Sequence, residues 1–117
     1  MAGLQLRDVR ELEAKAGLAA QLLTALANER RLAILCELLE GERSVGELVA
    51  AVGLTQSALS QHLAKLRAAG IVATRREAQT INYRFDSEAA RDVMETLADI
   101  YCRPKPRRNR PKIGSGK

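Results

Sequence analysis

Residues 53–66, GLTQSALSQHLAKL, constrain the fold of this chain more than any other segment. The segment opens with a turn and continues as a helix whose apolar residues recur at helical spacing. These residues predict a face that packs inward, made of Ala58, Leu59, Leu63 and Leu66. The rest of the surface is crowded with short hydroxyls, amides, one imidazole and one ammonium group, from Thr55, Gln56, Ser57, Ser60, Gln61, His62 and Lys65. Such groups suit base edges and phosphates, so this face points to DNA binding.

Capping signals place a second helix directly before this one. Ser44 and Glu47 have capping-box spacing and predict a short helix that ends near Gly53. Thr55 then starts the helix described above, which stops at Gly70. Two capped helices joined by a tight turn are the helix-turn-helix layout.

Two further helices are predicted upstream. Apolar spacing favours an amphipathic first helix over roughly residues 8–27. Asn28 can cap a second helix that ends at Gly41. Its expected apolar stripe consists of Leu32, Leu35, Cys36 and Leu39.

Downstream, residues 71–76 and 80–85 have β character and are joined through residues 77–79. Partial alternation of apolar residues predicts a hairpin, whose tip region carries Arg75, Arg76 and Gln79. A hairpin beside a helix-turn-helix forms a wing that can lie along the DNA backbone or reach into the minor groove. Asp86 or Ser87 then caps a last helix. Its predicted inner face contains Val93, Met94, Leu97, Ala98 and Tyr101.

These elements predict a mainly α fold with a small β-hairpin wing, a winged helix-turn-helix, in residues 1–102. The chain has 117 residues and only three aromatic ones, so Leu, Ala, Val and Ile must fill a single modest core. Residues 103–117 hold all three prolines and have no periodicity, which predicts a basic, disordered tail. No run approaches a membrane span and no signal-peptide pattern opens the chain, so we expect a cytoplasmic protein without a membrane partner.

The net charge of +5 is unevenly distributed. Residues 103–117 hold seven basic side chains and no acid, whereas the other 102 residues have a formal charge of −2. Within them, residues 53–85 carry a local charge of +4. A basic patch on a slightly acidic domain is what phosphate contacts require.

An enzymatic function is disfavoured because the sequence lacks the residues and motifs that catalysis requires. The chain has one histidine, no nucleophile beside a base and no phosphate-binding glycine loop. We therefore expect no catalytic residues and no cofactor. A winged helix that binds protein rather than DNA is the better alternative, and the polar face of residues 55–65 argues against it.

The sequence resembles the ArsR/SmtB family of winged-helix repressors over roughly residues 20–102. Three segments carry the resemblance: ALANERRLAILCELLEGERSVGEL, TQSALSQHLAKLRAAGIVATRREAQTINYRF and LADIYC. They are most similar to the branch that senses sulfane sulfur and to the nodulation regulators. The resemblance implies a homodimer built by the first and last helices, which binds a palindromic operator in double-stranded DNA and is loosened by an inducer.

Under this interpretation, Thr55, Gln56, Ser57 and Gln61 contact bases. Phosphates or the minor groove are contacted by Ser60, His62, Lys65, Arg75 and Arg76. Two alternatives remain open: Arg75 and Arg76 as ordinary solubilising residues of a hairpin, and His62 as a surface histidine.

Many members of this family sense metals, but the ligands are poor here. The third helix has SVGEL where one well-known site needs Cys-x-Cys, and the last helix offers three carboxylates without a histidine. Carboxylates alone are weak ligands for soft or borderline metals, which disfavours a metal-responsive repressor.

The resemblance instead singles out Cys36 and Cys102, the only cysteines, which occur in the contexts ILC and IYC. It implies a dithiol that reactive sulfur species or an oxidant convert into a disulfide or polysulfide bridge within each subunit. From periodicity alone, Cys36 is a small buried hydrophobic residue. A repressor without a thiol inducer is the second alternative.

Overall fold

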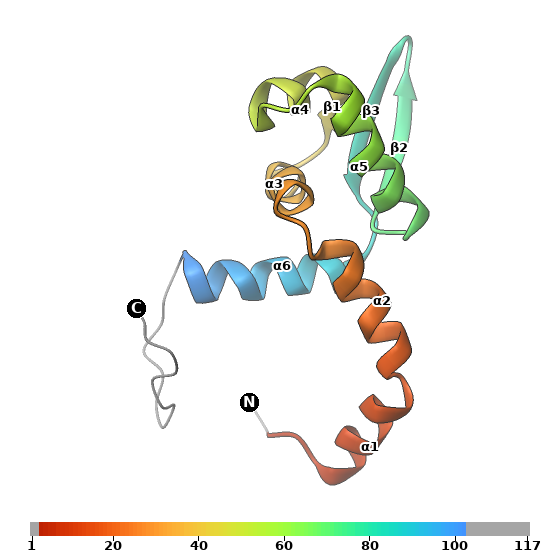
Figure 1. The fold of residues 1–117 in the computed structure, drawn as a ribbon, viewed down its shortest axis with the longest axis vertical. Coiled ribbons are helices and arrows are strands. Elements are labelled where there is room, and N and C mark those ends of the chain that lie inside the picture. Colours follow the sequence, from red (N-terminus) through yellow and green to blue (C-terminus); the bar gives the residue numbers. More distant parts are fainter. Residues whose placement is uncertain (1–2, 103–117) are drawn as a thin grey trace.

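The computed structural model describes residues 3–102. Within this range the chain forms helices and a small antiparallel sheet (Figure 1). The elements are α1 (Leu6–Ala14), α2 (Ala16–Leu26), α3 (Glu29–Leu38), β1 (Arg43–Ser44), α4 (Val45–Val52), α5 (Gln56–Ala68), β2 (Val72–Glu77), β3 (Thr80–Phe85) and α6 (Glu88–Tyr101). The predicted basic tail, residues 103–117, lies outside the described residues.

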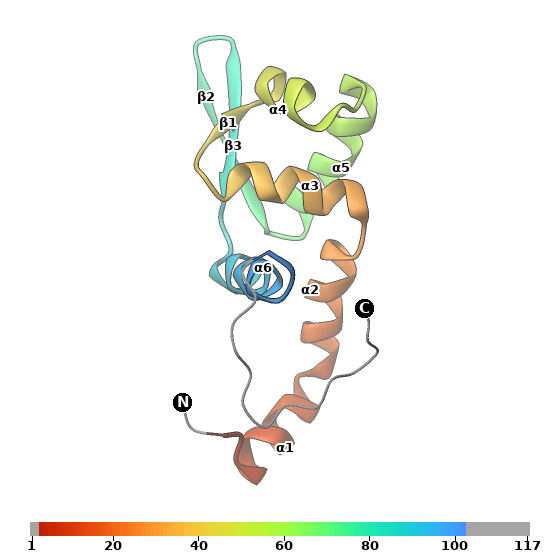
Figure 2. The same ribbon diagram turned by 90° about the vertical axis from the view of Figure 1, so that its left-hand side faces the viewer.

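Helices α3, α4 and α5 pack together, and the β2–β3 hairpin projects beside them as the wing (Figures 1 and 2). Helix α6 lies beneath this group, while α2 leads away from it to α1. The predicted winged helix-turn-helix is therefore confirmed.

Local hydrogen bonds set the helix starts where the sequence predicts them. Asn28, Thr55 and Ser87 each accept a hydrogen bond from a backbone N–H in the first turn of α3, α5 and α6. Ser44 and Glu47 form the predicted capping box of α4. Each such cap contributes about 1 kcal/mol, because it satisfies donors that the helix itself leaves unpaired.

The core gathers around α3 and α5. Leu59, Leu63 and Leu66 of α5 are fully buried, as predicted, while Ala58 is half-buried. The other buried side chains are Leu26, Ile34, Leu35, Leu38, Leu48, Ile71, Val72, Ala90 and Met94. Thus the apolar face of α5 anchors the helix, and its polar face turns outward.

Two predicted helix faces are partly wrong. In α3 the buried residues are Ile34, Leu35 and Leu38, whereas Cys36 is exposed. In α6 the predicted inner residue Tyr101 is 78% exposed. The reason is that residues 32–36 of α3 (LAILC) are consecutive apolar residues, which point to different sides of the helix, so the neighbouring elements select the buried side. Helix α6, in turn, extends beyond the core that covers its first turns.

The predicted first helix is two helices. The backbone at Lys15 leaves the helical region (φ −108°, ψ 16°) between α1 and α2, and Gly17 follows in the next turn. No residue of α1 is buried, so tertiary packing does not force a continuous helix through these positions.

The wing pairs β2 with β3 in the predicted hairpin, from Val72 opposite Phe85 to Glu77 opposite Thr80. Ala78 adopts a left-handed φ of 57°, as two-residue hairpin turns require. The short strand β1 was not predicted: Arg43 and Ser44 add to the free edge of β3, giving the order β1-β3-β2. Two residues are too short a stretch for alternation to show.

Among the described helices, none has the length and apolarity that crossing a bilayer demands.

Candidate DNA-binding surface and dithiol

The polar face of α5, which carries the residues predicted to contact DNA, is termed the reading face and consists of Thr55, Gln56, Ser57, Ser60, Gln61, His62 and Lys65. The turn that precedes α5 sets where this face begins. Helix α4 ends at Gly53, whose φ of 72° is left-handed, and Thr55 caps α5 through its Oγ1, which accepts a hydrogen bond from the Ala58 N–H at 3.1 Å. Because Gln56 and Ser57 follow immediately, their side chains project at the exposed start of the helix. The hydroxyl oxygen of Thr55 therefore accepts the capping hydrogen bond, and the hydroxyl hydrogen remains available to donate to an external partner.

The remaining polar side chains of the face lie on one exposed surface. The exposed members are Thr55, Gln56, Ser57, Ser60, Gln61 and Lys65. Opposite them, the leucines of α5 pack into the core. The structure thus brings the predicted contact residues of α5 together, and it holds them on a rigid, anchored helix.

His62 differs from its neighbours because it is only half exposed. Its Nδ1 is buried and has no hydrogen-bond partner among the described residues. Burial, followed by the positive charges of Arg31, Lys65 and Arg30, lowers the pKa of His62 below its usual value. These surroundings favour the neutral ring, whose N–H can still donate a hydrogen bond to a phosphate.

In the wing, the two predicted arginines have different surroundings. Arg75 Nε contacts both carboxylate oxygens of Glu42 at 3.1 Å, and its Nη2 lies 3.5 Å from Glu77. Its hydrogen bonds lower the pKa of Glu42 below the usual range. In the part of the chain that the structure describes, Arg76 is exposed and forms no ion pair.

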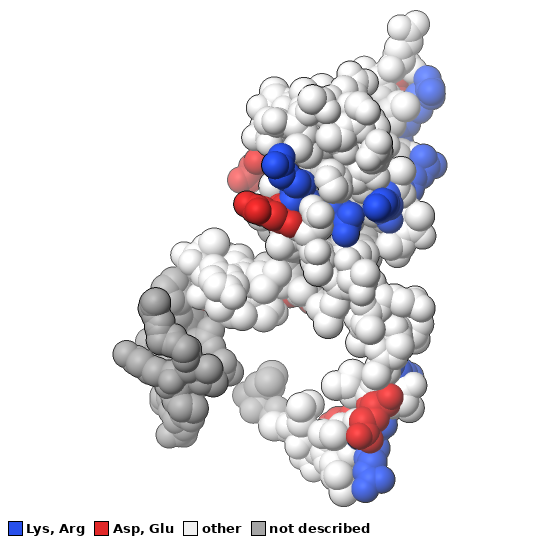
Figure 3. Space-filling model, viewed as in Figure 1, with Lys and Arg blue, Asp and Glu red and all other residues white. Residues whose placement is uncertain are grey.

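The ion pair with Glu42 gives Arg75 a structural role. Glu42 lies in the loop between α3 and β1, so the bidentate contact ties the wing to the body of the domain. Sequence inspection missed this contact because the two residues are 33 positions apart and nothing local signals it. Figure 3 shows Lys and Arg side chains on the visible face of the molecule over the region of α3, α5 and the wing.

The two cysteines are free and exposed, one in α3 and the other at the C-cap of α6. Burial contributes most to raising the pKa of Cys36, followed by the negative charges of Cys102 and Glu37. Although Cys36 reaches solvent, surrounding protein atoms therefore disfavour its thiolate. The interpretation of Cys36 as a buried core residue is wrong for the single chain, since its sulfur is accessible.

We expect Cys36 to react slowly with iodoacetamide at neutral pH. The thiolate is the reactive form, so the alkylation midpoint of Cys36 should lie above the ordinary thiol pKa of about 8.5. Cys102→Ser removes one of the negative charges that disfavour this thiolate, so it should speed alkylation of Cys36 at a given pH. Mass spectrometry of peptides across a pH series measures both effects. The urea-unfolded chain is the control, and a native midpoint at or below the unfolded one would contradict the expectation.

No group of three or more His, Cys, Asp or Glu side chains suited to a metal ion occurs within residues 3–102.

The model of the family described as bacterial regulatory protein, arsR family, matches residues 28–74. The transcriptional activator HlyU of Vibrio cholerae serotype O1 is 52% identical over 95 residues, which cover 81% of this chain and 88% of HlyU. The solved structure of reduced HlyU from Vibrio cholerae N16961 has a TM-score of 0.75 and 53% identity, and the match covers 80% of this chain and 98% of that one.

Two further solved structures share the fold. The transcriptional repressor BigR from Xylella fastidiosa has a TM-score of 0.76 and 42% identity, covering 80% of this chain and 95% of BigR. The homodimeric winged helix-turn-helix DNA-binding domain Mb0332 from Mycobacterium bovis has a TM-score of 0.66 and 33% identity, covering 86% of this chain and 89% of that domain. This chain therefore belongs to the arsR family of bacterial regulatory proteins, and it is a transcriptional regulator rather than an enzyme.

Proposed function

We propose that two copies of this chain form a sequence-specific DNA-binding repressor or anti-repressor, whose operator affinity falls when Cys36 and Cys102 become linked within one chain. One observation carries the switch. These cysteines are 66 positions apart in the sequence, yet they lie close enough in the fold for the charge of Cys102 to raise the pKa of Cys36.

In this proposal α5 enters the major groove. Gln56, Ser57 and Gln61, together with Thr55, contact base edges. Ser60, His62 and Lys65 contact phosphates, and Arg76 adds a contact from the wing to a phosphate or to the minor groove. The contact between Arg75 and Glu42 supports a positioning role for Arg75, which fixes the angle of the wing.

The apolar surface left on α1, α2 and α6 supports the dimer. The large exposed apolar side chains are Leu4, Leu6, Val9, Leu12, Leu18, Leu23, Ile100 and Tyr101. They lie on the segments that extend away from the core (Figures 1 and 2). Exposed apolar area on this scale marks an interaction surface, and the relative Mb0332 is described as homodimeric. Related by two-fold symmetry, the α5 helices would read half-sites about one DNA turn apart, ~34 Å or a multiple of it.

The sulfur chemistry takes two steps. A Cys102 thiolate attacks the terminal sulfur of a hydropolysulfide, whose S–S bond breaks and releases a polysulfide that is shorter by one sulfur, and Cys102 becomes a persulfide. Cys36 then loses its proton and attacks the sulfur bonded to Cys102, so that hydrosulfide leaves and a disulfide forms. We assign the first attack to Cys102 because the raised pKa of Cys36 makes that thiol the poorer nucleophile.

A bridge would join the end of α6 to α3, whose Ile34 and Leu35 pack in the core alongside α5. It therefore couples the proposed dimer surface to the body that carries the reading helix. A tenfold fall in operator occupancy needs only ~1.4 kcal/mol of differential affinity between the two states. A small displacement of α5 relative to its partner suffices.

The proposal predicts that the bridged protein binds its operator at least tenfold more weakly than the dithiol. The operator is first selected from random duplexes with the reduced protein, and polysulfide then forms the bridge, which mass spectrometry locates. Fluorescence anisotropy measures the dissociation constant of each form. Cys36→Ser and Cys102→Ser are matched controls, because each keeps one thiol and should lose the response to polysulfide.

Equal operator binding by the dithiol, the bridged form and Cys36→Ser would rule out the switch. That result would favour the alternative of a regulator without a thiol inducer, which the raised pKa of Cys36 also supports.

A further inference from the structure

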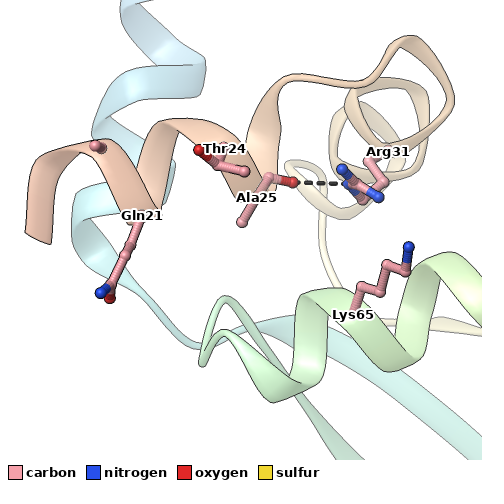
Figure 4. Close-up of a pocket in the computed structure, with 6 residues that line it drawn as sticks. Gln21, Thr24, Ala25, Arg31 and Lys65 are labelled. Carbon is pink, nitrogen blue, oxygen red and sulfur yellow. Dashed lines mark hydrogen bonds between the residues drawn. The ribbon is translucent and has the colours of Figure 1, made fainter. Parts of the chain in front are cut away.

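A group of positive charges lies at the edge of the reading face of α5, where α2, α3 and α5 meet, and Lys65 belongs to both. An open pocket of about 450 Å³ occupies this junction. Its lining residues are Ala20, Gln21, Thr24, Ala25, Arg31 and Lys65. Figure 4 shows the Arg31 and Lys65 side chains approaching each other at one end of the pocket, opposite Gln21.

Arg31 is held in place before any ligand arrives. Its Nε donates a hydrogen bond of 2.8 Å to the backbone oxygen of Ala25, at the end of α2 (Figure 4). This bond leaves both terminal guanidinium nitrogens without a partner among the described residues. A fixed guanidinium loses little conformational entropy when it binds an oxyanion.

Two other cations near Arg31 have no acidic partner among the described residues. Lys65 lines the pocket with Arg31, and Arg30 precedes Arg31 in the first turn of α3. Arg30 and Lys65 are exposed, and neither takes part in an ion pair within residues 3–102. Both, together with Arg31, act electrostatically on His62. Positive charges gathered in this way repel one another, and an anion bound among them would relieve that repulsion.

We propose that Arg30, Arg31 and Lys65 bind a phosphate of the DNA backbone beside the groove that α5 reads. The inference rests on the proposed function and adds two residues of α3 to the contact surface. Lys65 follows Gln61 by one turn on α5, so a phosphate held here flanks the bases that Gln61 reaches. Through Ala25, the same contact also connects the DNA backbone to α2, which carries part of the apolar surface proposed for the dimer.

The test is the salt dependence of DNA binding by Arg30→Gln and Lys65→Gln. Each lost phosphate contact should reduce the slope of log K against log salt by ~0.9, or ~1.8 for a dimer with two sites. Affinity for operator and random duplexes should fall equally, because a phosphate carries no sequence information. Arg7→Gln in α1 is the matched control, since it removes the same charge from an exposed residue at the far end of the molecule (Figure 1).

The variant Arg31→Lys distinguishes a structural role of Arg31 from phosphate binding by its charge. Lysine keeps the positive charge but cannot reproduce the planar guanidinium donors. It should retain most of the salt slope, whereas Arg31→Gln should lose it. Thermal melting of all variants checks their folding. If Arg30→Gln and Lys65→Gln keep the slope of Arg7→Gln, the site is wrong even though the protein binds DNA. If the wild type binds no duplex at low salt, the proposed function itself fails.

A free anion is distinguished from a DNA phosphate through His62, the only histidine in the chain. The NMR signals of its imidazole protons should shift when duplex DNA is added, and this shift should diminish in Lys65→Gln. Millimolar inorganic phosphate alone should leave the signals in place. An equal shift with inorganic phosphate would overturn the assignment to DNA.

Discussion

Replacing Gln56 and Ser57 together by alanine should remove most of the preference for operator over random DNA. Each good base contact from a major-groove helix is worth about 1–3 kcal/mol, so the loss of two of them should lower the preference by between about 30-fold and about 20,000-fold. Competition between labelled operator and unlabelled random duplex measures the ratio. Binding to random duplex should change little, because Lys65 and the arginines remain.

The helix itself should survive this double substitution, since Thr55 supplies the cap and alanine is the strongest helix former. Glu95→Ala with Thr96→Ala, on the exposed side of α6, is a matched control that alters two polar residues away from α5. Retention of full operator preference by the Gln56/Ser57 variant would show that α5 does not read the bases.

Leu63→Ala should destabilise the fold by about 2–5 kcal/mol, the range for large-to-small changes in a packed core. Leu63 is fully buried at the centre of α5, between the body of the domain and the reading face. A small domain has only about 5–15 kcal/mol of stability, so this change removes a large part of it. Urea unfolding at a fixed chain concentration measures the difference, because a dimer's stability depends on concentration.

Arg67→Ala is the control for this cavity. It also cuts a long side chain of α5 back to alanine, but Arg67 is exposed and lies outside the proposed dimer surface, so the change should stay within about 0.5 kcal/mol. If both variants lose a similar amount of unfolding free energy, burial in the core does not account for the stability of α5.

Much of the fold was predictable because the signals are local. The caps at Asn28, Ser44, Thr55 and Ser87 each act on backbone groups two or three residues away. The hairpin likewise follows from two β-rich runs and a short connection. The amphipathic pattern of α5 sufficed to identify its buried leucines, because a single side of that helix is apolar.

The site was only partly predictable. The exposed polar residues of α5 follow from its pattern, and the pairing of Cys36 with Cys102 was suggested by family resemblance. The contact between Arg75 and Glu42 and the electrostatic effect of Arg30 and Arg31 on His62 were missed. Each of these joins elements distant in sequence, and exposed arginines carry no pattern that reveals their partner.

By itself, the sequence determined where most helices begin, which side of α5 faces inward and which chemical groups face outward. Those features depend on hydrogen bonds and apolar spacing within a few residues. The tertiary structure alone decided the exposure of Cys36, the pairing of the edge strand β1 and the contact between Glu42 and Arg75 of the wing. The physical reason is that burial and ion pairing depend on neighbours from elsewhere in the chain, and their positions exist only once the chain has folded.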